Sequence, residues 1–177
     1  MRRVLLFLMV AFLLVAAAQQ QDKSKRPSPP ANAECNFADG KKVVVDYSQP
    51  STRGRKIFGE LVPYGQVWRT GANEATALVS DVDLSVGGTA VPAGKYTLYT
   101  LPSPESWQLI ISKKTGQWGI PYPGEQEDFT RIDMNVEKTP GPVERFTISF
   151  DRTKPDACVM KLEWENTRAS VEISEKK

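Results

Sequence analysis

Beyond residue 32, apolar and polar residues alternate with a period of two, the pattern of strands that bury one face. The alternation recurs in eight segments: 42–48, 76–86, 95–101, 107–112, 130–136, 145–150, 158–164 and 169–174. Turn-forming residues such as the Pro140-Gly141-Pro142 run separate them. No segment has the 3.6-residue period of an amphipathic helix. The pattern therefore predicts an all-β fold.

Short strands with one apolar face each can hide those faces by stacking two sheets or by closing a barrel. We expect an antiparallel β-sandwich, with a jelly-roll arrangement as one candidate topology. Residues 33–177 amount to the size of one ordinary domain, and they contain no internal repeat or second linker. We predict that 33–177 form a single β-sandwich domain.

The first residues resemble a secretory signal peptide. Arg2 and Arg3 precede an unbroken apolar run from Val4 to Val15, and small residues at 16–18 suit a cleavage site. A helix over that run would span roughly 18 Å, short of the roughly 30 Å hydrocarbon core. We therefore predict a signal peptide over 1–18, an exported protein that is periplasmic or secreted, and no stable membrane insertion after cleavage.

Residues 19–32 are rich in Gln, Ser and Pro and cannot bury a core, which favours a disordered linker. Without Arg2 and Arg3, 21 of the 23 basic residues remain, and they equal the 21 acidic residues in number. The formal net charge of the remaining chain is therefore zero. A neutral chain offers no electrostatic attraction for phosphate backbones. We expect no nucleic-acid partner.

The two cysteines fall at the two ends of the predicted domain. Cys158 lies on the apolar face of its strand segment, and Cys35 precedes the first strand. An oxidising compartment favours a Cys35–Cys158 disulfide, worth about 4 to 5 kcal/mol in the chain-entropy model. Two inert buried thiols are the alternative. Two cysteines without histidine cannot form an ordinary zinc site, so we expect no metal and no cofactor.

The sequence contains no histidine, which removes histidine-dependent triads, general bases and metal sites. Paired carboxylates could still support a hydrolase, and Glu74, Asp81 and Asp83 are the candidates. Acidic residues that alternate on a strand usually form its solvated face. The acidic segment 124–128 could hold calcium but lacks the spacing of a known loop. We expect binding rather than catalysis.

The stretch 55–76 is the densest in potential ligand contacts. Arg55 and Arg69 carry planar guanidinium groups suited to carboxylates, phosphates or sugar hydroxyls, while Asn73 and Glu74 add hydrogen-bonding groups. The alternative is structural, with an arginine paired to Glu74 and Asn73 bonded to backbone groups of an irregular loop. Trp68 is expected in the core.

A second candidate stretch, 116–125, places Trp118 and Tyr122 among glycines and prolines. Exposed rings of this kind stack on sugars or bind proline-rich peptides, unless they form a lid over one end of the sandwich. If both stretches met, they would form a pocket for a glycan, a peptide or a small polar ligand.

Several motifs resemble a known family. These are G-R-x-I-F-G from Gly54, V-P-Y-G-x-V-W-R-T-G-A-N-E-A-T from Val62, and P-A-G-x-Y from Pro92, with similarity extending to 162–173. Together they are similar to domain-of-unknown-function family 2911 of exported bacterial proteins. The resemblance implies no catalytic residues.

Three hypotheses therefore stand. A glycan or small-ligand binding domain requires the arginines and Glu74 to line an open cavity. An envelope-structural or protein-interaction module requires the polar cluster to be internal and mutually satisfied. A carboxylate hydrolase requires two carboxylates about 5 to 9 Å apart across a cleft.

Overall fold

A computed structural model describes residues 22–176. The predicted signal peptide and residues 19–21 of the predicted linker lie outside these residues. Two one-turn 3-10 helices, η1 (Lys23–Lys25) and η2 (Glu125–Glu127), are the only helical elements of the described part. None of its helices is long and apolar enough to cross a membrane.

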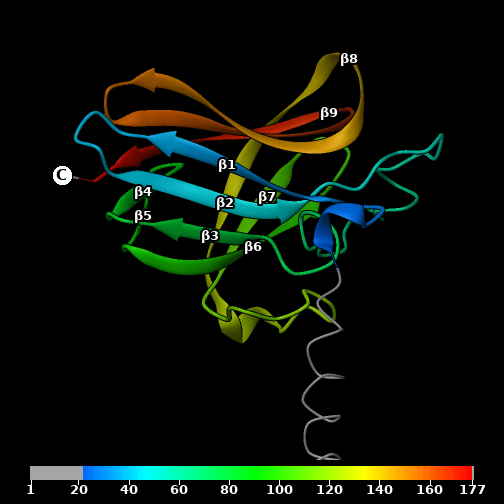
Figure 1. Cartoon of the computed structure of the whole chain (residues 1–177), viewed down its shortest axis with the longest axis horizontal. Coiled ribbons are helices and arrows are strands. Elements are labelled where there is room, and N and C mark those ends of the chain that lie inside the picture. Colours follow the sequence, from blue (N-terminus) through cyan, green and yellow to red (C-terminus); the bar gives the residue numbers. More distant parts are fainter. Residues whose placement is uncertain (1–21, 177) are drawn as a thin grey trace, which may run out of the picture.

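Nine strands form one antiparallel sheet with the order β1-β2-β3-β6-β7-β8-β9-β4-β5 (Figure 1). Their bounds are β1 Pro30–Asn36, β2 Lys42–Ser48, β3 Ala77–Ser80, β4 Leu84–Val86, β5 Thr89–Val91, β6 Gly94–Pro102, β7 Trp107–Ser112, β8 Asp128–Lys154 and β9 Ala157–Glu175. The predicted all-β, antiparallel class is confirmed.

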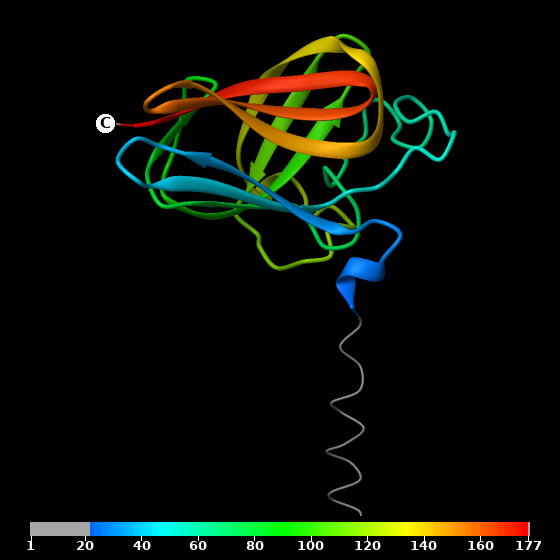
Figure 2. The same cartoon turned by 45° about the horizontal axis from the view of Figure 1, so that its top comes forward.

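The sheet folds over on itself through its two longest strands. The first part of β8 pairs with β7, and its later part forms a hairpin with β9 that lies over β1 and β2 (Figures 1 and 2). The Tyr47 hydroxyl of β2 donates to the carbonyl of Ile148 at 3.3 Å and accepts from its N–H at 3.0 Å. The sheet is not closed. This arrangement is compatible with the expected sandwich but does not establish it or the jelly-roll variant.

Several predicted strands have different boundaries in the structure. The segments 130–136 and 145–150 belong to β8, and 158–164 and 169–174 belong to β9. The proline-glycine run at 140–142 does not end β8, because an irregular register between Lys138 and Val143 absorbs it within the hairpin. The segment 76–86 instead divides into β3 and β4. Strands β1 and β5 were not among the predicted segments.

Alternating apolar side chains fill the space between the folded parts of the sheet. At one end of this core, five aromatic rings meet: Phe58, Trp68, Trp107, Phe146 and Trp164. The rings of Trp68 and Trp164 stack with centroids 5.7 Å apart and an interplanar angle of 18°. Trp68 therefore packs against the core, as expected, and fixes the loop that carries it.

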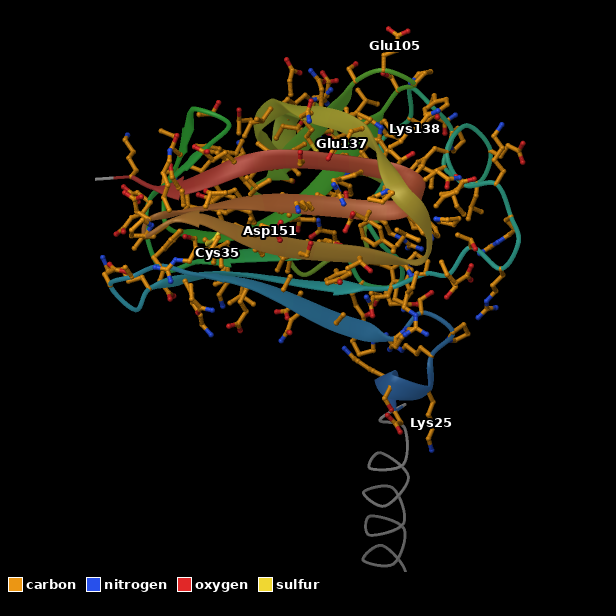
Figure 3. All side chains as sticks on the ribbon, turned by 90° about the horizontal axis from the view of Figure 1, so that it is seen from above. Lys25, Cys35, Glu105, Glu137, Lys138 and Asp151 are labelled. Carbon is orange, nitrogen blue, oxygen red and sulfur yellow. A yellow bond between two sulfur atoms is a disulfide. The ribbon has the colours of Figure 1, made fainter. Side chains whose placement is uncertain are left out.

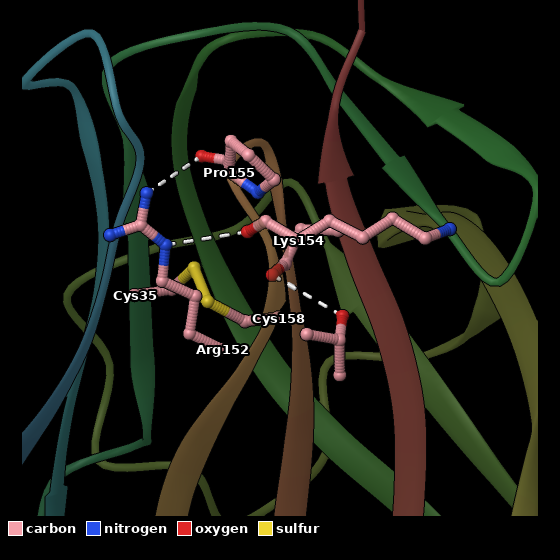
Figure 4. Close-up of a disulfide and its surroundings, with 7 residues drawn as sticks. Cys35, Arg152, Lys154, Pro155 and Cys158 are labelled. Carbon is pink, nitrogen blue, oxygen red and sulfur yellow. Dashed lines mark hydrogen bonds between the residues drawn. A yellow bond between two sulfur atoms is a disulfide. The ribbon is translucent and has the colours of Figure 1, made fainter.

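A disulfide joins Cys35 of β1 to Cys158 of β9, with the two Cα atoms 6.2 Å apart (Figure 4). The bridge spans 123 positions of sequence and confirms the predicted pairing. Beside it, Arg152 donates from Nε to the carbonyl of Lys154 and from Nη2 to that of Pro155. The turn between β8 and β9 is thereby fixed next to the bridge.

Part of the predicted disordered linker has a defined place in the structure. Pro30 to Asn32 begin β1, and residues 22–29, here called the strap, include η1 and lie beyond the start of β1, where Lys25 is labelled in Figure 3. Backbone pairing with β2 holds the start of β1. Ion pairs of Lys23 and Arg26 with Glu74, in the connection between β2 and β3, hold the strap. Composition alone does not predict such contacts.

Candidate functional site

The connection between β2 and β3, residues 49–76, is held tightly against the sheet. Trp68 exchanges two backbone hydrogen bonds with Thr100 of β6, at 2.8 and 2.9 Å. Thr70 is fully buried at a φ of 53°, a left-handed conformation that a β-branched residue rarely adopts. The Thr76 hydroxyl donates to the Thr70 carbonyl at 2.7 Å and supports this turn. Strained backbone of this kind is concentrated at functional sites.

Arg55 and Arg69 line one cavity of about 340 Å³, here called the arginine cavity. Apart from these arginines and Ser28, its walls are predominantly apolar and include Leu61, Val67, Trp68, Ile120 and Trp164. Leu61 and Ile120 are 46% and 60% exposed and form part of the rim. The cavity therefore combines two cationic groups with an apolar surface.

The guanidinium of Arg69 is partly buried without a carboxylate partner. Its Nη1 donates to the Asn73 carbonyl at 3.1 Å, and no Asp or Glu among residues 22–176 lies within ion-pairing distance. Burial lowers the pKa of Arg69, which the nearby Tyr99 partly opposes. A cation in this state gains from an anion that enters the cavity.

Arg55 is more exposed and is oriented by the backbone. Its Nε donates to the Thr52 carbonyl at 2.9 Å, and its Nη2 donates to the Ser51 carbonyl at 2.8 Å. Two of its donors thus fix the guanidinium plane, and the others stay available toward the cavity. The structure therefore places two of the four predicted polar ligand contacts, Arg55 and Arg69, at the same cavity.

Asn73 and Glu74 do not join this cavity. Arg26 of the strap donates from Nη1 to both carboxylate oxygens of Glu74, at 3.0 and 2.8 Å, and Lys23 lies 3.0 Å away. The pKa of Glu74 is lowered to about 2, and the hydrogen bond from Arg26 is the largest cause of this shift. Asn73 donates from Nδ2 to the Ser28 carbonyl at 2.9 Å. The expected group of four therefore divides, because the strap supplies partners for two of its members.

Trp118 and Tyr122 also occupy different environments. Trp118 is 51% exposed and lines a second cavity of about 330 Å³ with Asn73 and the strap, here called the tryptophan cavity. The Tyr122 hydroxyl instead donates to Asp128 at 2.5 Å, and its ring packs edge-on against Tyr99 at 5.1 Å. Burial, with the bond to Asp128, raises the pKa of Tyr122 to about 12. Tyr122 lines neither cavity.

The family model described as "Protein of unknown function (DUF2911)" matches residues 28–173. The chain belongs to the DUF2911 family. No curated protein and no solved structure shows significant similarity to it. The DUF2911 match contains every lining residue of the arginine cavity, whereas Asp22, Lys25, Arg26 and Pro27 of the tryptophan cavity precede it.

Two of the three candidate carboxylates of this DUF2911 domain, Asp83 and Glu74, are engaged in structural contacts. Asp83 accepts the N–H of Ala93 at 2.8 Å, and Glu74 is paired with the strap. In the acidic segment 124–128, Glu125 and Asp128 both pair with Arg131, at 3.0 and 2.9 Å. No group of three or more His, Cys, Asp or Glu within 22–176 is placed to hold a metal ion.

Two contributors to these cavities in the DUF2911 protein, Leu61 and the strap, are not among the predicted site residues. Leu61 was not singled out, although an exposed leucine beside Gly59 and Pro63 is a signal for a loop tip. The composition of the strap is typical of a linker. Its Lys23 and Arg26 reach Glu74 only through the tertiary fold, so no local pattern indicates their role.

Proposed function

We propose that the protein is an exported, non-catalytic binding domain whose arginine cavity takes a small organic anion with an apolar body, such as a monocarboxylate. The supporting observation is the half-buried Arg69 guanidinium that lines a cavity without a carboxylate partner among residues 22–176. Arg55 supplies a second fixed guanidinium at the same cavity. Guanidinium groups bind carboxylates through charge-assisted, often bidentate, hydrogen bonds.

The apolar walls favour an anion with a hydrophobic part over a strongly hydrated one. Contact with Leu61, Trp68 and Ile120 would remove apolar ligand surface from water. A cavity of about 340 Å³ lies at the lower end of the size range of small-molecule sites. A ligand of the size of hexanoate or benzoate suits this space.

Titration calorimetry with hexanoate and benzoate, and with the neutral hexanamide and benzamide, tests the proposal. Arg69→Gln should weaken carboxylate binding by about tenfold or more, since a charge-assisted bond contributes about 1.5 to 3 kcal/mol. Arg152→Gln, an arginine beside the disulfide, is the matched control. Equal binding of acids and amides, or equal affinities for the two variants, would overturn the proposal.

A further inference from the structure

The tryptophan cavity has features of a binding site that is separate from the arginine cavity. Trp118 is exposed, although its neighbours on both sides are fixed. The Gln117 side-chain amide donates to the Tyr99 hydroxyl at 3.1 Å, and the backbone carbonyl of Gln117 accepts the N–H of Ala75 at 3.2 Å. Gly119 is buried against Arg69, where an added Cβ would lie 3.1 Å from two atoms of the arginine side chain. The backbone that carries the indole is therefore already ordered, which removes part of the entropic cost of ligand binding.

Polar side chains with unused hydrogen-bonding capacity lie beside this ring. Asn73 uses one amide hydrogen on Ser28, and its Oδ1 has no hydrogen-bond partner within residues 22–176. Arg26 uses only Nη1 on Glu74, so its Nε and Nη2 remain without a partner in the described part of the chain. Both Asn73 and Arg26 line the cavity with Trp118. The guanidinium of Arg26 can donate hydrogen bonds to neighbouring hydroxyls. The side-chain amide of Asn73 can both donate hydrogen bonds to hydroxyls and accept them.

The charges around the tryptophan cavity compensate one another. Arg26 is paired with Glu74 at 2.8 Å, and the ammonium of Lys25 lies 3.8 Å from the Asp22 carboxylate. This differs from the arginine cavity, where Arg69 has no anionic partner among the described residues. A fully charged ligand would gain little here, because each cation already has an anion close by. The local electrostatics therefore favour a neutral, hydroxyl-rich ligand.

We infer that the tryptophan cavity binds a neutral sugar ring of an oligosaccharide. A pyranose has a face of C–H groups that can pack on the indole of Trp118 through dispersion. Its hydroxyls can hydrogen-bond to Asn73 Oδ1 and to the free donors of Arg26. A cavity of about 330 Å³ accommodates one sugar ring, and its open side allows the other sugar residues of the oligosaccharide to extend into solvent. The site does not depend on ligand binding in the arginine cavity.

Titrations with maltotriose, cellotriose, laminaritriose and chitotriose, followed by calorimetry and by tryptophan fluorescence, test this inference. At least one of these neutral saccharides should bind, and Trp118→Ala should weaken that binding by about tenfold or more, a change of about 1.4 kcal/mol in the binding free energy. Trp118→Phe retains an aromatic face and should preserve part of the affinity. Phe129→Ala, which removes an aromatic side chain that is 40% exposed and lines neither cavity, is the matched control.

Three results would overturn the inference. Absence of binding by all four saccharides excludes the ligand class. Equal affinities for Trp118→Ala and Phe129→Ala exclude the indole as the contact surface. Loss of saccharide binding in Arg69→Gln, with Trp118→Ala unaffected, would place the sugar in the arginine cavity instead. Unchanged melting temperatures of the variants establish that each remains folded.

Discussion

Arg26 binds both carboxylate oxygens of Glu74, at 3.0 and 2.8 Å, across 48 positions of sequence. This contact attaches the strap to the β2–β3 connection and gives both cavities part of their walls, since Ser28 lines one and Arg26 the other. The ion pair is partly exposed, so its contribution to the stability of the whole domain is small. Its effect is instead local.

Glu74→Gln should release the strap without unfolding the domain. The amide cannot form the ion pairs with Lys23 and Arg26, and the global free energy of unfolding should change by less than about 1 kcal/mol. Hydrogen exchange of the backbone amides in 22–29 measures the release. Glu60→Gln, which removes an exposed ion pair with Lys56, is the control and should leave exchange in the strap unchanged.

Acidification should release the strap in the unmodified protein. The pKa of Glu74 is about 2 in the folded state and 4.5 ordinarily, so its stabilising contribution is present above pH 4.5 and is lost as the pH falls toward 2. Strap exchange, corrected for the intrinsic rate at each pH, should increase across this window. The same increase in Glu74→Gln would show that another group is responsible.

Gly119→Ala should weaken carboxylate binding in the arginine cavity. An alanine Cβ would lie 3.1 Å from the Cβ and Cδ of Arg69 and 3.2 Å from the Cα of Ala75, so the arginine must move. Gly116→Ala is a close match, because Gly116 also has a positive φ but faces open space. Both variants should lose about 1 kcal/mol of stability or more from backbone strain. Calorimetry with hexanoate should show weaker binding for Gly119→Ala alone; equal affinities would contradict this mechanism.

Reduction of the disulfide should raise the mass of the intact protein by two hydrogens. The bridge closes a loop of 123 positions, and its loss should lower the free energy of unfolding by about 2 to 5 kcal/mol. Urea unfolding of the Cys35→Ala/Cys158→Ala variant measures this difference. A mass that does not change on reduction would show that the purified chain lacks the bond.

The stability of the protein should decrease as the pH rises from 10 toward 12, partly because of Tyr122. Its pKa is raised to about 12 in the folded state, so the unfolded chain loses this proton first. Tyr122→Phe should therefore show a weaker decrease in urea unfolding experiments over this range. Tyr64→Phe, at a tyrosine that is 41% exposed, should behave like the unmodified protein.

Local patterns predicted most of the fold because the strands bury one face. The alternation in 42–48 and 107–112 corresponds closely to β2 and β7, whose inward residues Val43, Val45 and Leu109 are fully buried. The three-residue strand β5 is too short to show a period. The strand β1 has a polar, proline-containing sequence, and its pairing with β2 decides its structure.

Residue types predicted the composition of the candidate site better than its arrangement. Arg55 and Arg69 share a cavity, but Glu74, which the binding hypothesis also placed there, does not line it. The partners of Asn73 and Glu74 could not be predicted, because they come from a strap whose docking depends on the folded positions of both residues. Tyr122 lies close in sequence to Trp118, but its contact with Asp128 directs it to a different environment.

The pairing of β4 with β9 has a consequence for the order of assembly. Leu84 pairs with Glu175 and Val86 with Ile173, so the β4–β5 hairpin acquires its neighbour only from the last part of the chain. During synthesis this hairpin must wait for its neighbouring strand until residues 173–175 have emerged. Shortening the chain before residue 173 would leave the hairpin without a docking partner and prone to self-association.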